Sequence, residues 1–236
     1  MRLGIMQPYF FPYLGYFELI ARTDRWVVLD TVQYNRKSWM NRNRILHPNN
    51  GWQYINAPVH HAPRGTLIEK VFVQDIDKAQ NRILAQLGHY RGHAPYYHQV
   101  IKVVQNAFTR AADKRISTLN IAAIESVCDY IGIYFSWLRA SDLGLDAANV
   151  EHAGEWALRI SKILGADAYL NPIGGRELFV PSEWDAAGIK LSFTTIPDLR
   201  YECWPYVWEP LLSIVDVLMW LPPKVVRDEI LKKSLI

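Results

Sequence analysis

The chain has 236 residues, of which 50% are hydrophobic, 13% aromatic and 21% charged. This composition excludes an intrinsically disordered chain, and the length allows a large core, so we expect a single domain over residues 1–236. No apolar run approaches the roughly 20 residues that span a bilayer. Met1–Ile5 leads into a motif rather than into the apolar core of a signal peptide, so we expect a cytoplasmic protein without membrane insertion.

The formal net charge of +3 is small for a protein that holds duplex DNA through its phosphates, and no DNA partner is expected. The charge is uneven, because one stretch without an acidic residue carries Arg36, Lys37, Arg42 and Arg44. From charge alone this stretch indicates either a local anion site or a solvated hairpin rim. The two cysteines predict neither a disulfide framework nor a zinc site.

The chain opens with a strand-turn-helix pattern. Leu3–Gln7 is typical of a short buried strand, and the apolar spacing over residues 14–20 predicts a helix. Arg25–Asp30 is a second buried strand that ends in an acid. From about residue 33 to 73, polar and aromatic residues alternate, which predicts antiparallel hairpins inserted after the second strand, with a turn near Ser38.

The second half of the chain alternates helical and strand patterns. Helical spacing over about 78–131 predicts a helical insertion of three helices. Further strands are predicted at 134–138, 168–170 and 189–195, with helices at 149–164, 210–220 and 223–235. The predicted fold class is α/β, a mainly parallel Rossmann-like sheet covered on both faces, with an antiparallel hairpin insertion and a helical insertion.

In such sheets, ligands bind outside the carboxyl ends of the strands. By position this rule selects Gln7, Asp30 and Asn171, together with Ser141–Asp142. The densest pattern there is the segment from Gln7 to Tyr16, in which two prolines open a loop and Gly15 permits close backbone approach at a helix start. This shape suits a phosphate or carboxylate. The alternative is an aromatic plug on the sheet, although buried Gln7 and tyrosine hydroxyls would need partners.

The segment from Asp30 to Ile45 is the second candidate. Arg42 and Arg44 present rigid guanidinium forks for carboxylate or phosphate. The neighbouring residues that would orient a polar ligand such as a sugar are Gln33, Tyr34 and Asn43. Gly174–Gly175 is the third candidate, because a glycine pair permits backbone contact with a ligand, although turn geometry explains it equally well.

These segments, together with residues 212–216, resemble the WbqC-like protein family from Gly4 to about Asp216. The pairing of Gln-Pro-x-x-Phe-Pro-x-x-Gly-Tyr with a downstream Trp-x-x-Arg-Asn-x-Ile carries the resemblance. Positions that match the family pattern are Gln7, Pro8, Phe11, Pro12, Gly15, Tyr16, Asp30, Gln33, Tyr34, Trp39, Arg42, Asn43 and Arg44. Members sit among bacterial surface-polysaccharide and O-antigen genes, and the suggested role is transfer of glycine or another aminoacyl group to a sugar.

The resemblance implies an acyl or aminoacyl transferase acting on an amino sugar or sugar nucleotide. In that hypothesis Arg42 and Arg44 hold an anionic group, and Asp30 is the general base. The reacting group would be oriented by Gln7, Tyr13 and Tyr16. We therefore expect five residues to converge on one cleft at the carboxyl ends of the strands, namely Gln7, Tyr16, Asp30, Arg42 and Asn43. An aminoacyl-tRNA donor would contact the basic hairpin first, although nothing in the sequence demands it. No cofactor is predicted beyond a nucleotide or an activated acyl donor.

Two alternatives stay open. Tyr13-Leu14-Gly15-Tyr16 occupies the place of the His-x-Gly-His motif of Rossmann-like nucleotidyltransferases, which would imply an enzyme that consumes ATP and magnesium. A non-catalytic module that binds a sugar nucleotide or a partner is the other. No metal site is predicted, because no carboxylate or cysteine completes a ligand set around His60–His61 and His47. The oligomeric state is not indicated.

Overall fold

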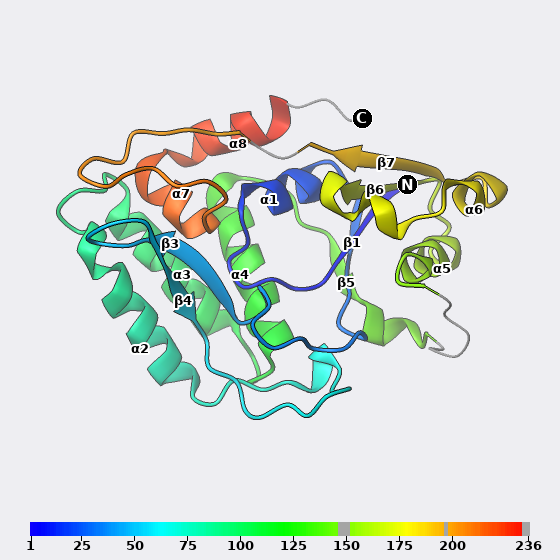
Figure 1. The fold of residues 1–236 in the computed structure, drawn as a ribbon, viewed down its shortest axis with the longest axis horizontal. Coiled ribbons are helices and arrows are strands. Elements are labelled where there is room, and N and C mark those ends of the chain that lie inside the picture. Colours follow the sequence, from blue (N-terminus) through cyan, green and yellow to red (C-terminus); the bar gives the residue numbers. More distant parts are fainter. Residues whose placement is uncertain (146–151, 196–197, 233–236) are drawn as a thin grey trace.

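The computed structural model describes residues 1–145, 152–195 and 198–232. Its centre is a five-stranded sheet in the order β5-β2-β1-β6-β7, and all neighbouring strands are parallel (Figure 1). These strands are β1 (Arg2–Met6), β2 (Arg25–Val28), β5 (Trp137–Arg139), β6 (Ala168–Pro172) and β7 (Lys190–Thr194). The α/β class with a mainly parallel sheet is therefore confirmed.

Helices cover both faces of this sheet. Trp26, Val28 and Leu170 face a core that also contains side chains of α1 (Leu14–Ala21), α4 (Ile116–Ile131), α7 (Ile214–Trp220) and α8 (Pro223–Lys232). Leu3, Val27 and Tyr169 face a second core with α5 (Glu155–Ile163) and α6 (Pro181–Ala186). None of the described helices is long and apolar enough to cross a membrane.

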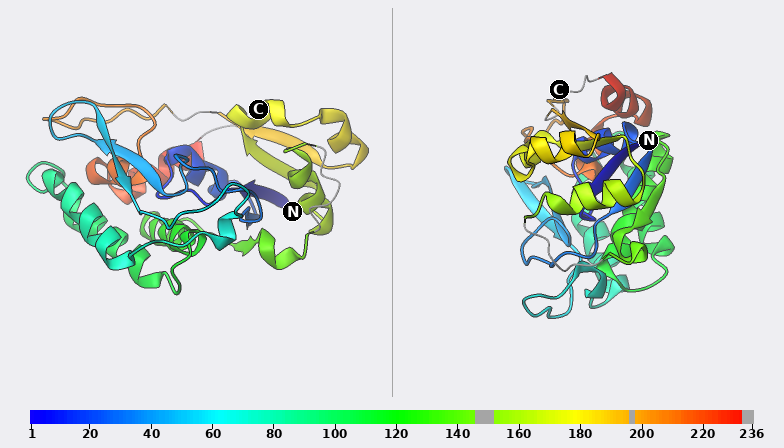
Figure 2. Two further views of the ribbon diagram at one scale, coloured as in Figure 1. Left: turned by 60° about the horizontal axis from the view of Figure 1, so that its bottom comes forward. Right: turned by 90° about the vertical axis from the view of Figure 1, so that its right-hand side faces the viewer.

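Two insertions separate β2 from β5 in the chain. The first contains an antiparallel hairpin of β3 (Arg42–Leu46) and β4 (Trp52–Asn56). The second contains α2 (Ile76–Leu87), α3 (Tyr97–Arg110) and α4, as predicted. Figure 2 shows α2 and α3 at one end of the molecule and α5 and α6 at the other. The remaining short elements are the 3-10 helices η1 (Ile68–Lys70), η2 (Gly88–Tyr90), η3 (Ala140–Leu143) and η4 (Ile173–Leu178).

The hairpin differs from the prediction in two respects. Its turn lies at residues 47–51 rather than near Ser38, and residues 33–41 form an irregular loop. The alternation beyond β4 gives only isolated bridges, such as Gln33 with Leu67 and Val59 with Val73, instead of further hairpins. Alternation identifies half-buried extended chain, but it does not distinguish a regular ladder from single bridges. The short helix α6 was not predicted.

Particular residues fix where the elements begin and pack. An added Cβ at Gly4 would lie 2.8 Å from the Trp26 ring, so glycine lets this large side chain pack across β1. Asp75 caps α2 by accepting a hydrogen bond from the Lys78 amide, and Gly132 ends α4 in the left-handed conformation at φ 73°.

Candidate functional site

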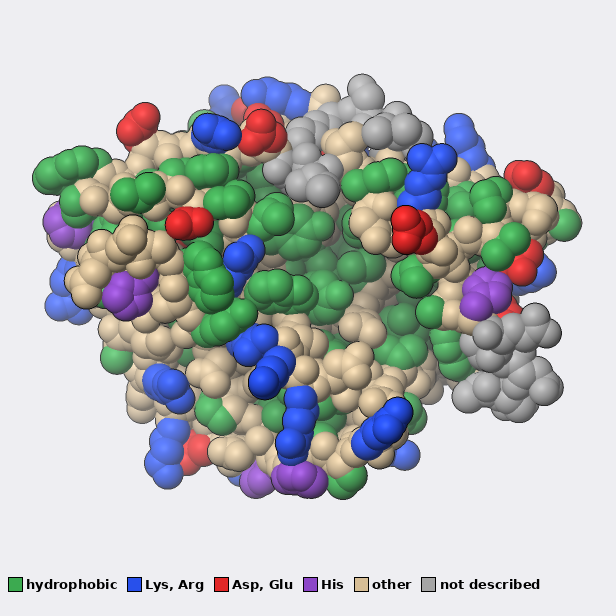
Figure 3. All heavy atoms as spheres, in the orientation of Figure 1, with side chains coloured by type: hydrophobic (Ala, Val, Ile, Leu, Met, Phe, Trp, Pro, Cys, Tyr) green, Lys and Arg blue, Asp and Glu red, His purple; other side chains and the backbone are tan. Residues whose placement is uncertain are grey.

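A cavity of about 730 Å³ opens at the carboxyl ends of the parallel strands. Gln7 follows β1, Leu29 follows β2, and Asn171 lies near the end of β6 on its wall. The opposite side is formed by the 33–41 loop and β3, so the hairpin insertion closes over the end of the sheet. Figure 3 shows this face hollowed near its middle, with hydrophobic side chains inside. This is the position where ligands bind to open parallel sheets.

The loop between β1 and α1 is held in place through its main chain. Asn120 donates hydrogen bonds of 2.7 Å to the carbonyls of Pro8 and Met40, and Asn43 donates bonds of 3.0 Å to those of Phe10 and Phe11. Ser213 adds a hydroxyl bond of 2.7 Å to the Phe11 carbonyl. We call Asn43, Asn120 and Ser213 the clamp residues. They are at most 4% exposed, and Phe11 between them has the left-handed φ of 40°.

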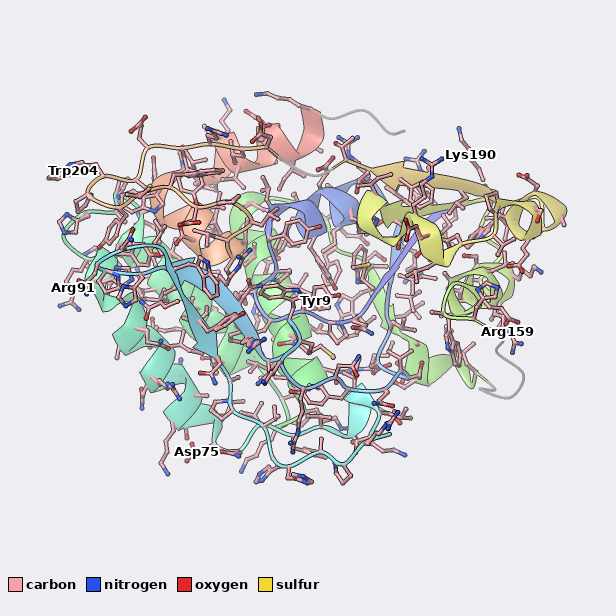
Figure 4. All side chains as sticks on the ribbon, in the orientation of Figure 1. Tyr9, Asp75, Arg91, Arg159, Lys190 and Trp204 are labelled. Atoms are coloured by element: carbon pink, nitrogen blue, oxygen red, sulfur yellow. The ribbon has the colours of Figure 1, made fainter. Side chains whose placement is uncertain are left out.

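Because the main chain is clamped, the side chains of Gln7, Tyr9 and Tyr13 line the cavity. Burial raises the pKa of both tyrosines, so their hydroxyls stay protonated at neutral pH and act as hydrogen-bond donors. Figure 4 places Tyr9 near the middle of the molecule, between the hairpin and β1. The segment from Gln7 to Tyr13 thus supplies neutral polar groups to the cavity.

Arg44 is the cation on the described cavity wall. Its guanidinium lies 5.5 Å from the centre of the Trp39 ring and 5.1 Å from that of Trp52, and it donates a 3.1 Å bond to the Leu211 carbonyl. Two aromatic rings and a main-chain carbonyl therefore hold the guanidinium in place, and no acidic side chain in the described part of the chain pairs with it.

The facing wall is built by β6 and η4. Asn171 accepts a 2.9 Å bond from the Tyr169 hydroxyl and donates a 3.0 Å bond to the Pro172 carbonyl. An added Cβ at Gly175 would lie 2.3 Å from the Asn171 amide nitrogen, whereas one at Gly174 would meet nothing within 4 Å. Gly175 thus makes room for the Asn171 side chain, while Gly174 leaves the cavity open.

Several predicted residues lie elsewhere. Asp30 is fully buried, and its carboxylate accepts bonds of 3.0 Å from the Ser141 amide and hydroxyl and pairs with Arg139 at 3.3 Å. Gly15 and Tyr16 are buried in α1, where the Tyr16 hydroxyl donates a 2.9 Å bond to the Gln7 carbonyl. These residues support the wall from behind.

Arg42 and Tyr34 line a different pocket, on the other side of the 33–41 loop. The structure therefore separates the five residues expected to share one cleft: Gln7 and Asn43 reach the cavity, while Tyr16, Asp30 and Arg42 do not line it. The remaining candidates on its wall are Tyr13, Gln33, Arg44, Asn171, Gly174 and Gly175.

The cavity wall also contains polar and aromatic residues that were not chosen as site residues from the sequence, namely Tyr9, Asn35, Trp39, Trp156 and Thr195. Tyr9, Asn35 and Trp39 lie inside the two motif segments. Treating every polar or aromatic residue of these segments as a candidate site residue would have included them. Trp156 and Thr195 come from α5 and the end of β7 and have no local signal. The described lining residues include no carboxylate, imidazole or thiol.

A buried carboxyl lies apart from the cavity. Asp216 accepts hydrogen bonds from the hydroxyls of Tyr90 and Tyr201 and a 2.8 Å bond from the Leu46 amide. Complete burial raises its pKa to about 6 despite these donors. No group of three or more metal-ligating His, Cys, Asp or Glu side chains occurs within the described ranges.

Comparisons with known proteins agree with the motif segments. The family model described as the WbqC-like protein family matches residues 7–228. A relative in Mycobacterium tuberculosis (strain ATCC 25618 / H37Rv), Uncharacterized protein Rv1507c, is 26% identical over 226 residues, which cover 92% of each chain. No solved structure matches. The match over nearly the whole chain shows that this protein belongs to the WbqC-like family.

Proposed function

We propose that the cavity binds an amino sugar, as a sugar nucleotide, and transfers an acyl or aminoacyl group to its amine. The observation that carries this proposal is the chemistry of the wall: neutral amides and tyrosine hydroxyls with one fixed guanidinium. Gln33, Asn35 and Asn171 match the alternating donors and acceptors of sugar hydroxyls. Arg44 suits a phosphate or carboxylate of the same ligand.

The transfer step needs few groups from the protein. The uncharged sugar amine attacks the carbonyl carbon of an activated ester or thioester, and the carbonyl electron pair moves to oxygen. The bond to the leaving oxygen or sulfur then breaks, and the amine proton passes to the leaving group through water. Neutral donors such as Tyr9 and Tyr13 would stabilise the oxyanion, which is often the largest catalytic contribution. A free amine attacks without a protein base, consistent with the described wall residues, among which there is no carboxylate or imidazole.

Thermal-shift assays with amino-sugar nucleotides test binding, because a ligand that binds the native state raises the melting temperature. Incubation of the best binder with a glycyl thioester then tests transfer through the mass of the amide product. Binding with product formation supports the transferase, whereas binding without product supports the non-catalytic module. Turnover that requires ATP and magnesium would instead identify a ligase.

A further inference from the structure

A second pocket, of about 330 Å³, lies across the 33–41 loop from the cavity. Gln33, Asn35 and Trp39 of this loop face the cavity, whereas Tyr34, Arg36, Lys37 and Asn41 face the second pocket. The arginines of β3 divide in the same way, Arg44 toward the cavity and Arg42 toward the second pocket. The 33–41 loop therefore separates two sites of different chemistry.

The second pocket is strongly basic. The loop contributes Arg36 and Lys37, β3 contributes Arg42, and the segment after β4 contributes His60 and His61. No aspartate or glutamate is among its described lining residues. Figure 3 shows lysine and arginine side chains between the middle of this face and histidines at its lower edge. Clustered positive charge without an acid repels metal ions and attracts anions.

The Arg42 side chain is held in place before any ligand arrives. The Arg42 guanidinium lies 4.2 Å from the centre of the Tyr54 ring and donates a hydrogen bond to the Lys37 carbonyl. Lys37 itself has the left-handed φ of 62°, a conformation that costs energy for a residue with a side chain. Burial raises the pKa of Tyr34 although Arg36 and Arg42 oppose this, so its hydroxyl remains a donor at the pocket wall.

We propose that this pocket binds a phosphate or diphosphate group, independently of the ligand in the main cavity. Arg42 offers a planar fork of donors that fits phosphate oxygens, and Arg36 and Lys37 add charge from the same side. The pocket volume of about 330 Å³ accommodates a diphosphate. Its residues include Arg36, Lys37 and Arg42 of the basic stretch and the pair His60–His61, none of which lines the main cavity.

Calorimetric titration of the full chain with pyrophosphate at low ionic strength tests the proposal. Arg42→Ala is expected to weaken binding about tenfold or more, since charge-assisted hydrogen bonds are lost. Lys37→Gly is expected to weaken binding severalfold and to keep or raise the melting temperature, because glycine relieves the strained φ. Arg82→Ala removes the same charge from exposed α2 and serves as the matched control. Uridine diphosphate in place of pyrophosphate shows whether a nucleoside adds affinity.

Arg44→Ala separates this proposal from the function of the main cavity, because Arg44 lines only the latter of these two sites. Unchanged pyrophosphate affinity in this variant is expected. Loss of affinity in Arg44→Ala with none in Arg42→Ala would overturn the proposal and assign the phosphate to the cavity. Absence of pyrophosphate and uridine diphosphate binding, with tight binding of single-stranded RNA, would also overturn it, because the basic surface would then serve a polymer.

Discussion

Two sets of polar residues meet at the end of the sheet, and they use their hydrogen bonds differently. The clamp residues donate their hydrogen bonds to main-chain carbonyls of the loop between β1 and α1. Gln7, Tyr13 and Gln33 instead present their side chains to the cavity. A polar residue in a motif can therefore serve a ligand indirectly, by fixing the backbone that carries the cavity wall. Stability and ligand affinity should therefore respond to different substitutions.

The largest expected effect is from Asp30→Ala. Removing this fully buried carboxylate leaves the Arg139 guanidinium without its acidic partner and the Ser141 amide without its acceptor, which should lower the free energy of unfolding by about 3 kcal/mol. Urea unfolding measures the loss, and Asp142→Ala, an exposed acid in the same segment, is the control. An Asp30→Ala protein that is fully stable but inactive would instead identify Asp30 as the general base.

Asn120→Ala should have a smaller effect than Asp30→Ala, and it tests the clamp itself. Two carbonyls, of Pro8 and Met40, lose a donor in the interior, so we expect a loss of about 2 kcal/mol. Asn106→Ala on the exposed side of α3 controls for the change within a helix. Equal stabilities of the two variants would show that the loop is held by other contacts.

The buried Asp216 gives a prediction that depends on pH. Its pKa rises from 3.8 to about 6 on folding, so the native state binds more protons than the unfolded state between these values. Its stabilising contribution is full below pH 3.8 and is lost as the pH rises through about 6, by about 3 kcal/mol. The difference in unfolding free energy between wild type and Asp216→Asn should shrink accordingly. Parallel pH curves for the two proteins would refute the shift.

Gly175→Ala is expected to have the smallest effect on stability. Its effect on ligand affinity should come from one residue of the cavity wall, Asn171. The new Cβ displaces the Asn171 amide, whereas the Cβ of Gly174→Ala enters open space. Affinity for an amino-sugar nucleotide should fall about tenfold in the first variant, the loss of about one hydrogen bond to the ligand. If Gly174→Ala lowers the affinity equally, the effect comes from crowding of the cavity and not from Asn171.

The sequence predicted the sheet more fully than the site. Buried strands such as Arg25–Val28 and the spacing of α2, α3 and α4 are local signals, and these elements formed where expected. The rule for carboxyl ends also placed Gln7 and Asn171 on the wall. The direction of a side chain in an irregular loop is set by tertiary contacts, so alternation around Ser38 did not reveal which residues face which pocket.

Asp30 and Arg42 show most clearly what a sequence pattern alone does not predict about the site. An acid after a buried strand is equally suited to catalysis and to pairing, and only the fold brings Arg139 and Ser141 to Asp30. Arg42 and Arg44 are only two positions apart in β3, yet they line different pockets, on either side of the 33–41 loop. Nothing in their sequence spacing distinguishes the two arginines.

Thermal shifts of wild type, Arg44→Ala and Arg42→Ala with a panel of amino-sugar nucleotides test the central claim most directly. We expect at least one ligand to raise the melting temperature of wild type, and that shift to be strongly reduced in Arg44→Ala, which alters the cavity wall. A shift that survives in Arg44→Ala but is lost in Arg42→Ala would contradict this assignment, because the ligand would then bind in the second pocket and not in the cavity at the carboxyl ends of the strands.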